Sequence, residues 1–362
     1  MIRRLKEPRL RAYLRKITAV STDYLTRVAD PGSRLHPFYL DYRDGRIDCA
    51  QLIARLPHAA AIGDSLSTDV YISSALSTFW RARTRRGKNW FLDTGSSPSS
   101  VCSVFKRLEK LTPLVATEYG GLGAMVDSGH DRLSFSRRVL RTRNFSGQVS
   151  QLLSHKRFPD LILTWIGHNN VDWAWRSPPA ELKQSEKRLQ RLSERFRQHY
   201  TRQMHRLVAR AQTESHHIAI VVYGLVNFAS FFKAREVAEA LREKNPKLYP
   251  YLEVDFKHFI SMRPAYRGNL IRLTGMMNEQ LRAMVGQFDR KLGRFPNIRV
   301  QYSDVLAKAD LSRIEVIHEV DGWHPSVQGH NVFAEAAFND LGPSLEFLGI
   351  TEAESGDRGV GR

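Results

Sequence analysis

The sequence is poor in cysteine and contains no long apolar run. Only Cys49 and Cys102 occur in the 362 residues, which excludes a disulfide framework and a cysteine-rich metal site. No stretch approaches the roughly 18 uninterrupted apolar residues of a transmembrane helix, and no apolar secretory segment follows the basic start of the chain. We therefore expect a cytoplasmic or peripheral membrane protein. Because no histidine and carboxylate group has ligand spacing, we also expect no metal and no cofactor.

Acidic residues are scarce relative to basic ones. The chain has 55 Lys and Arg against 37 Asp and Glu, a formal net charge of +18. Such a surface favours anionic partners, and two interpretations stay open: a merely solvated basic surface, and peripheral contact with an anionic membrane. No recognised nucleic-acid-binding module accompanies the charge, so no nucleic acid is expected as a partner.

One apolar run ends in a tight turn. Ala59 to Ile62 are followed by Gly63, Asp64, Ser65 and Leu66. A continuous apolar run is typical of a strand that helices cover on both faces. Ser65 is therefore expected at the carboxyl end of a strand, where open α/β sheets bind ligands. Taken alone, the tetrapeptide indicates no more than an ordinary strand-to-helix turn.

Two further blocks accompany this turn. An apolar strand over 160–166 ends in Gly167, His168, Asn169 and Asn170, and the block 321–326 reads Asp-Gly-Trp-His-Pro-Ser. In this order the three blocks resemble the GDSL lipase/esterase family, also called the SGNH hydrolases, over roughly residues 57 to 345. The resemblance implies an α/β fold, a three-layer α/β/α sandwich with a mostly parallel five-stranded sheet, and ester hydrolysis.

Serine-based ester hydrolysis needs an imidazole beside the hydroxyl and a third group that orients the imidazole. Ser65 would supply the hydroxyl and His324 the imidazole. Asp321 lies three residues before His324, so a turn lets its carboxylate accept a hydrogen bond from the other ring nitrogen. Pro325 disfavours a helix at His324 and favours a fixed loop. His330 is not chosen as the base, because it falls at the start of the closing helix.

The resemblance also implies three donors for the oxyanion: the N–H of Ser65, the N–H of a glycine and the side-chain amide of Asn169. Two glycines are candidates. Gly147 is preferred because Asn144 precedes it and a helix follows, whereas Gly123 also follows a candidate strand. Asn170 stands where the family has an aspartate, which we interpret as a support residue. Asp64 is assigned to ordering the turn.

The chain divides into three predicted regions. Residues 1–56 form a basic helical extension, whose apolar spacing continues through Ile17 and Val20 and which then becomes loops over 31–47. Residues 57–345 form the hydrolase domain, with an aromatic-rich insertion at about 227–275 that prolines divide into short pieces, and 346–362 form a disordered tail. Within the domain the sequence predicts strands over 59–63, 113–119, 139–143, 160–166, 216–223 and 297–302, and helices over 70–84, 99–111, 149–155, 181–212, 277–292 and 331–338.

These features predict a serine esterase or lipase, by extension a phospholipase or lysophospholipase. The long span between Ser65 and Gly147 resembles the phospholipase B-like branch of the family, and the aromatic insertion suits an acyl chain. Two alternatives remain: a carbohydrate acetyl esterase of the same family, and a non-catalytic protein that binds an anionic ligand on the same scaffold.

Overall fold

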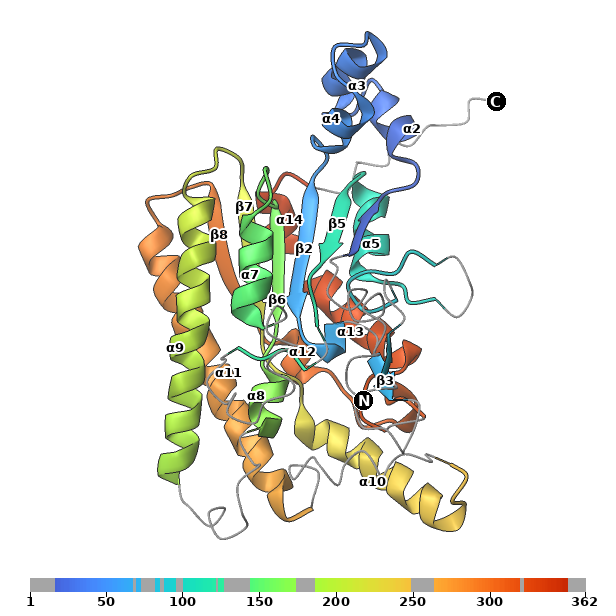
Figure 1. The fold of residues 1–362 in the computed structure, drawn as a ribbon, viewed down its shortest axis with the longest axis vertical. Coiled ribbons are helices and arrows are strands. Elements are labelled where there is room, and N and C mark those ends of the chain that lie inside the picture. The colour runs from blue at the N-terminus through green and yellow to red at the C-terminus, as the bar shows by residue number, and fades with distance from the viewer. Residues whose placement is uncertain are drawn as a thin grey trace, which may run out of the picture.

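A six-stranded sheet lies at the centre of the computed structural model (Figure 1). The structure describes residues 17–67, 70–72, 82–84, 88–95, 100–121, 123–126, 144–173, 186–248, 264–319 and 322–350. Five strands are parallel, which confirms the α/β class and the strands predicted over 59–63, 113–119, 160–166, 216–223 and 297–302; the candidate strand over 139–143 lies outside the described residues. In sheet order the strands are β1 (Ile17–Val20), β5 (Val115–Glu118), β2 (His58–Gly63), β6 (Leu161–Trp165), β7 (Ile218–Tyr223) and β8 (Ile298–Ser303).

The sixth strand, β1, was not expected. It pairs antiparallel with β5, with Ile17 opposite Glu118 and Val20 opposite Val115. The predicted helical continuation through Ile17 and Val20 is therefore wrong. These β-branched residues suit a strand, and the outer edge of β5 offers unpaired backbone groups that β1 satisfies. The rest of the predicted basic helix, residues 1–16, lies outside the described residues.

The order of the strands places a crevice at the end of β2. The chain passes from β2 to β5 on one side and then from β5 to β6 on the other. Right-handed crossovers in opposite directions put their helices on opposite faces, and ligands bind where the direction changes. Accordingly, α7 (Phe145–Leu153) and α9 (Glu186–Ala211) cover one face, whereas α5 (Val104–Leu111) and α13 (Val327–Asp340) lie on the other (Figure 1).

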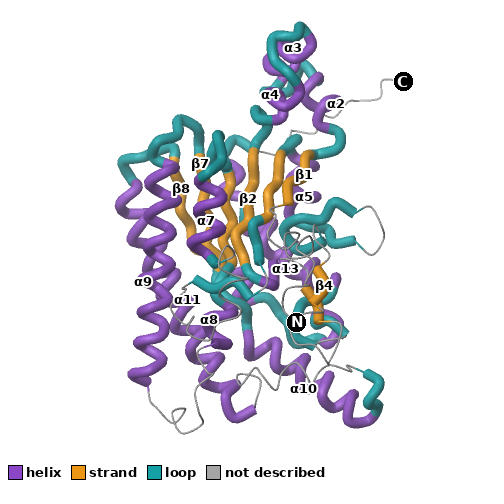
Figure 2. Tube along the Cα trace, in the orientation of Figure 1, coloured by secondary structure: helices purple, strands orange, loops and turns teal. Residues whose placement is uncertain are grey.

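Three short helices lie beyond the amino ends of the parallel strands (Figure 2). They are α2 (Tyr24–Ala29), α3 (His36–Arg43) and α4 (Cys49–Ile53). Val28, Leu35 and Leu52 pack there in an apolar cluster separate from the main core. The loop expected over 31–47 is thus partly wrong, because Pro37 lies in the first turn of α3, where a helix does not need the N–H.

Hydrogen bonds join the segment that carries α2, α3 and α4 to the last residues that the structure describes. The Nη1 of Arg34 donates to the carbonyl of Gly349 at 2.9 Å and to that of Leu348 at 3.4 Å. Both carbonyls follow α14 (Gly342–Phe347). Residues 346 and 347, assigned above to the disordered tail, are therefore the end of a helix, and 351–362 lie outside the described residues.

Two further predictions of local structure are wrong. The helix expected over 70–84 is replaced at its two ends by the strands β3 (Val70–Ile72) and β4 (Ala82–Thr84), which pair with each other. The aromatic insertion is not a set of short pieces, because the 17-residue helix α10 (Phe228–Lys244) runs through it. The two prolines of the insertion that the structure describes do not interrupt helices: Pro246 follows α10, and Pro264 is the first residue of α11 (Pro264–Leu292).

The remaining short elements are α8 (His168–Trp173), α12 (Val305–Lys308) and the 3₁₀ turns η2 (Ser65–Ser67) and η7 (Ile314–Val316). Both α8 and α10 lie beyond the carboxyl ends of the parallel strands (Figure 1). Among the helices of the described ranges, none is long and apolar enough to cross a bilayer.

Candidate active site

The turn that carries Ser65 continues directly from β2. Gly63 ends the strand, and Ser65 opens the 3₁₀ turn η2. A side chain at Gly63 would not fit, because a Cβ there would lie 2.1 Å from the Oγ of Ser67. Gln148 of α7 binds the Gly63 backbone twice: its Oε1 accepts from the N–H at 3.0 Å, and its Nε2 donates to the carbonyl at 2.8 Å. The start of α7 is thus fixed beside the turn.

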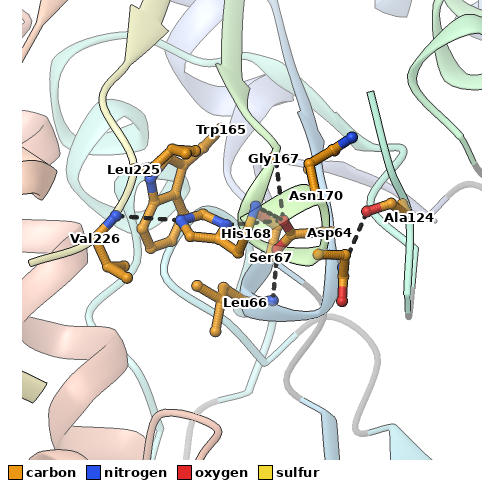
Figure 3. A network of polar contacts seen from close by, with 12 residues as sticks. Asp64, Leu66, Ser67, Ala124, Trp165, Gly167, His168, Asn170, Leu225 and Val226 are labelled. Carbon is orange, nitrogen blue, oxygen red and sulfur yellow. Dashed lines mark hydrogen bonds and ion pairs between the residues drawn. The ribbon is translucent and has the colours of Figure 1, made fainter. Parts of the chain in front are cut away.

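Asp64 is completely buried and accepts four N–H groups (Figure 3). Its Oδ1 accepts from the backbone of Leu66 at 3.1 Å. Its Oδ2 accepts from the backbone of Gly167 at 3.3 Å, and from the backbone and the Nδ1 of His168 at 3.2 and 2.7 Å. A buried carboxylate is tolerated only when its oxygens are satisfied in this way. Asp64 therefore orders the turn and joins it to the end of β6.

His168 extends this network to β7. The backbone N–H of Val226 donates to its Nε2 at 3.3 Å (Figure 3). A backbone N–H can only donate, so the proton of the imidazole lies on Nδ1 and points at Asp64. One buried histidine thus connects the carboxyl ends of three neighbouring strands. No pattern in the sequence predicted this role for His168.

The two amides after Gly167 both contact the loop that follows β5. The Nδ2 of Asn169 donates to the carbonyl of Ala124 at 2.9 Å. The Oδ1 of the buried Asn170 accepts from the N–H of Val126 at 2.8 Å. A carboxylate oxygen would accept the same N–H, so an asparagine in place of the family's aspartate keeps this contact.

Both candidate oxyanion glycines lie in segments that adjoin the turn. The backbone N–H of Phe145 donates to the carbonyl of Met125 at 2.9 Å, so the loop after β5 and the start of α7 are neighbours. Gly147 lies in the first turn of α7, with its N–H 2.8 Å from the carbonyl of Asn144. Gly123 lies in the loop with a φ of 69°, which favours glycine. The choice between them stays a prediction.

His324 lies in a loop between η7 and α13. The carbonyl of His324 accepts from the N–H of His318 at 2.7 Å, and the N–H of Gly322 donates to the carbonyl of His318 at 2.7 Å. Ile317 forms an antiparallel bridge with Pro325. This arrangement confirms the fixed loop predicted from Pro325. Asp321 lies outside the described residues.

The two predicted reactive side chains are both buried. Ser65 is 6% exposed and His324 is 3% exposed. His330 lies inside α13 and is buried as well. In the ranges that the structure describes, no group of three or more His, Cys, Asp or Glu residues could hold a metal ion.

An apolar cavity lies between the Ser65 turn and the His324 loop. It holds about 30 Å³ that water-sized spheres can occupy, within about 380 Å³ of atom-free space that includes open solvent, and ten apolar residues line it. They include Leu66, which follows Ser65, and Trp323 and Pro325, which flank His324. Phe228 and Phe231 of α10 form another wall and contact the Trp323 ring at centroid distances of 5.7 and 4.9 Å.

The family model of the GDSL-like lipases and acylhydrolases matches residues 60–337. The chain therefore belongs to this family of hydrolases, as the three sequence blocks indicated. Among curated proteins, none matches the sequence well enough to count as a relative.

Three solved structures are similar to this chain. A lipase from a goat rumen metagenome has 14% identity and a TM-score of 0.39, over 79% of this chain and 97% of its own. A carbohydrate esterase described as having divergent catalytic and non-catalytic binding functions has 12% identity and a TM-score of 0.42, over 81% and 66%. A carbohydrate esterase of family 3 from Talaromyces cellulolyticus has 12% identity and a TM-score of 0.38, over 80% and 99%.

Proposed function

We propose that this protein is a serine ester hydrolase with Ser65 as nucleophile, His324 as general base and Asp321 as the group that orients His324. One observation carries the proposal within the family. The apolar cavity is walled by the residue after Ser65 and by both neighbours of His324, so an ester whose acyl part fills it has its carbonyl between the two segments.

The reaction follows from these assignments. His324 takes the proton of the Ser65 hydroxyl while the Oγ of Ser65 attacks the ester carbonyl. The tetrahedral intermediate collapses to an acyl-enzyme, and His324 gives the proton to the departing alcohol. Water then attacks the acyl-enzyme with His324 again as base, and the carboxylic acid leaves as Ser65 recovers its proton.

The oxyanion is stabilised by N–H donors around the turn. The Ser65 backbone N–H is one. Gly147, at the start of α7 that Gln148 fixes beside Gly63, is proposed as another; its N–H donates to the Asn144 carbonyl in the structure and has to turn from that carbonyl to the oxyanion. Asn169 has two amide N–H groups. One binds the Ala124 carbonyl, and the second is the proposed third donor.

The substrate class is an ester with a medium or long acyl chain, including phospholipid or lysophospholipid. The cavity lining is apolar throughout, with two phenylalanines and a tryptophan in contact. A sugar acetyl ester would leave most of this surface in contact with water, at a cost that grows with the apolar area.

The basic composition supports a second element of the proposal. With a formal charge of +18, the protein is attracted to anionic lipid surfaces, and salt weakens this attraction. Hydrolysis of lipid in vesicles should therefore rise when anionic lipid is included and should fall back towards the neutral-vesicle rate at high salt.

The decisive experiment compares p-nitrophenyl esters from acetyl to dodecanoyl. We expect kcat/KM to rise with chain length until the cavity is filled. Phe231→Ala should lower kcat/KM about 10–100-fold more for long chains than for the acetyl ester, whose smaller loss reflects the contact of this ring with Trp323 beside His324. Val237→Ala is the matched control, because Val237 lies on the same helix and is 46% exposed. A preference of the wild-type enzyme for acetyl ester would overturn the acyl assignment.

A fluorophosphonate probe tests the chemistry separately. It should add covalently to Ser65 in the wild-type protein and should not react with Ser65→Ala. Labelling that persists in the variant would show that another residue is the nucleophile.

A further inference from the structure

Helix α10 reaches the His324 loop through a buried charge as well as through its aromatic residues. Arg235 is 3% exposed, and its Nη1 donates to the carbonyl of Gly322 at 3.2 Å. Gly322 has a φ of 59° and lies two residues before His324. The contact therefore falls at the point where the loop backbone turns before the histidine.

Arg235 is itself oriented by a network that crosses two helices. Its Nε donates to the Oε1 of Glu239 at 3.0 Å. Glu239 also accepts from Nη2 of Arg267 on α11, at 3.0 and 3.2 Å to its two oxygens. Arg267 in turn pairs with Glu236 at 2.9 Å and lies over the Phe232 ring, 5.0 Å from its centroid. The guanidinium of Arg235 is thus held in one orientation.

Burying a guanidinium has a large desolvation penalty, and an apolar residue of similar size would fill the same place without that penalty. The planar fork of arginine does what packing alone does not: it fixes a backbone oxygen in direction as well as in distance. The loop has its own bonds between His318, Gly322 and His324. The bond from Arg235 ties that unit to α10, which also walls the cavity.

We propose that Arg235 is a positioning residue for His324. The inference rests on the proposed function and adds to it that the insertion helix α10 sets the place of the catalytic base. In this role Arg235 acts through the loop backbone. It holds the Gly322 carbonyl, and through it the loop, at the distance from the Ser65 turn at which proton transfer is fast.

The test compares Arg235→Ala and Arg235→Lys with Lys233→Ala, a substitution at an exposed position of the same helix. We expect kcat for a short-chain ester to fall about 10–100-fold in Arg235→Ala while KM changes less than about twofold, because a short chain contacts little of the cavity wall that the loop forms. A lysine can reach the carbonyl but cannot also donate through an Nε to Glu239, so Arg235→Lys should be intermediate. Lys233→Ala should behave as the wild type.

Hydrogen exchange gives a readout that does not need activity. Backbone amides over 316–326 should exchange faster in Arg235→Ala, with the strands unchanged. A kcat equal to wild type in a folded Arg235→Ala, or unchanged exchange in this loop, would overturn the inference. If Arg235→Ala does not fold, the same two measurements on Arg235→Lys decide. If the wild type hydrolyses no ester and is not labelled at Ser65, the proposed function fails, and the exchange measurement alone decides whether Arg235 holds the loop.

Discussion

Ser65 lies in a turn that continues a central strand, whereas His324 lies in a loop that leads from η7 to α13. The turn is fixed by groups at the ends of the strands. Asp64 accepts N–H groups from the residues after β6, and Gln148 forms two hydrogen bonds with the Gly63 backbone at the end of β2. The loop is fixed from outside by Arg235 of α10 and by ring contacts with Phe228 and Phe231.

The difference separates two ways in which a fold can hold reactive groups. A change in the turn disturbs buried polar groups that join three strands, so it should affect stability and catalysis together. A change in the contacts of the loop leaves the sheet intact and should act mainly on catalysis. Substitutions on the two sides can therefore be compared directly.

Removing the reactive groups themselves should have the largest effect on catalysis. We expect Ser65→Ala and His324→Ala each to lower kcat by about 10³–10⁶-fold, and the double variant to lose little beyond the worse single one, because the groups act as a unit. Steady-state kinetics with a p-nitrophenyl ester measure this effect.

Two controls belong to this test. Ser67→Ala removes the acceptor of the Trp90 Nε1, at 3.2 Å, and should lower stability by about 1 kcal/mol while labelling of Ser65 continues. His330→Ala changes a histidine buried in α13. It should lower the free energy of unfolding while kcat changes little. Near-normal turnover by His324→Ala would show that another residue is the base.

Asp64→Asn should have the next largest effect and should act on stability and catalysis together. The amide places an NH₂ group opposite N–H donors, so we expect unfolding free energy to fall by about 2–5 kcal/mol, with kcat falling as well. Urea unfolding and ester kinetics measure the two effects. Asp48→Asn is the control, because Asp48 is an exposed N-cap of α4 and asparagine caps equally well. An Asp64→Asn protein of normal stability would remove the distinction between the two sides.

The smallest effect is expected at Asp310, on the α10 side. Hydrogen bonds from Ser312, and then from Ser230 of α10, lower the pKa of Asp310 from 3.8 to about 2. Since the pKa is lower in the folded state, the stabilisation is present above pH 3.8 and is lost as the pH falls towards 2. Asp310 is exposed, so the contribution is small.

The urea midpoint of Asp310→Asn should therefore lie slightly below that of the wild type at pH 6, and the gap should narrow by pH 3. A gap of equal size at both pH values would show that Asp310 acts by another route than its charge.

The sequence predicted the strands and the turn around Ser65 better than the surroundings of the His324 loop, for a physical reason. The strands β2 and β6 are mostly apolar; Gly63 ends β2, and Gly167 follows the end of β6 by two residues. This pattern marks buried parallel strands and their carboxyl ends. His168 was missed because its partner Asp64 lies 104 residues away, and no local pattern indicates that contact. Arg235 was missed because its loop partner is a backbone carbonyl, which every residue has.

Local patterns also misled where two structures compete for the same residues. Ile17 and Val20 fit a helical spacing. In the fold, however, the four residues 17–20 pair with the edge of β5 as a strand. The sequence of α10 has a helical spacing at Phe228, Phe231, Phe232 and Arg235. The prolines that follow suggested instead that the helix would be interrupted. Only the position of each proline relative to a helix end decides which effect wins.

The bond from Arg34 to the carbonyls of Leu348 and Gly349 spans 314 and 315 residues. During synthesis α3 leaves the ribosome long before the residues that follow α14. The N-terminal helices must therefore wait for the end of α14 before this contact can form. A nascent chain arrested before residue 348 should have every parallel strand of the sheet and still lack this link from Arg34 to the end of α14.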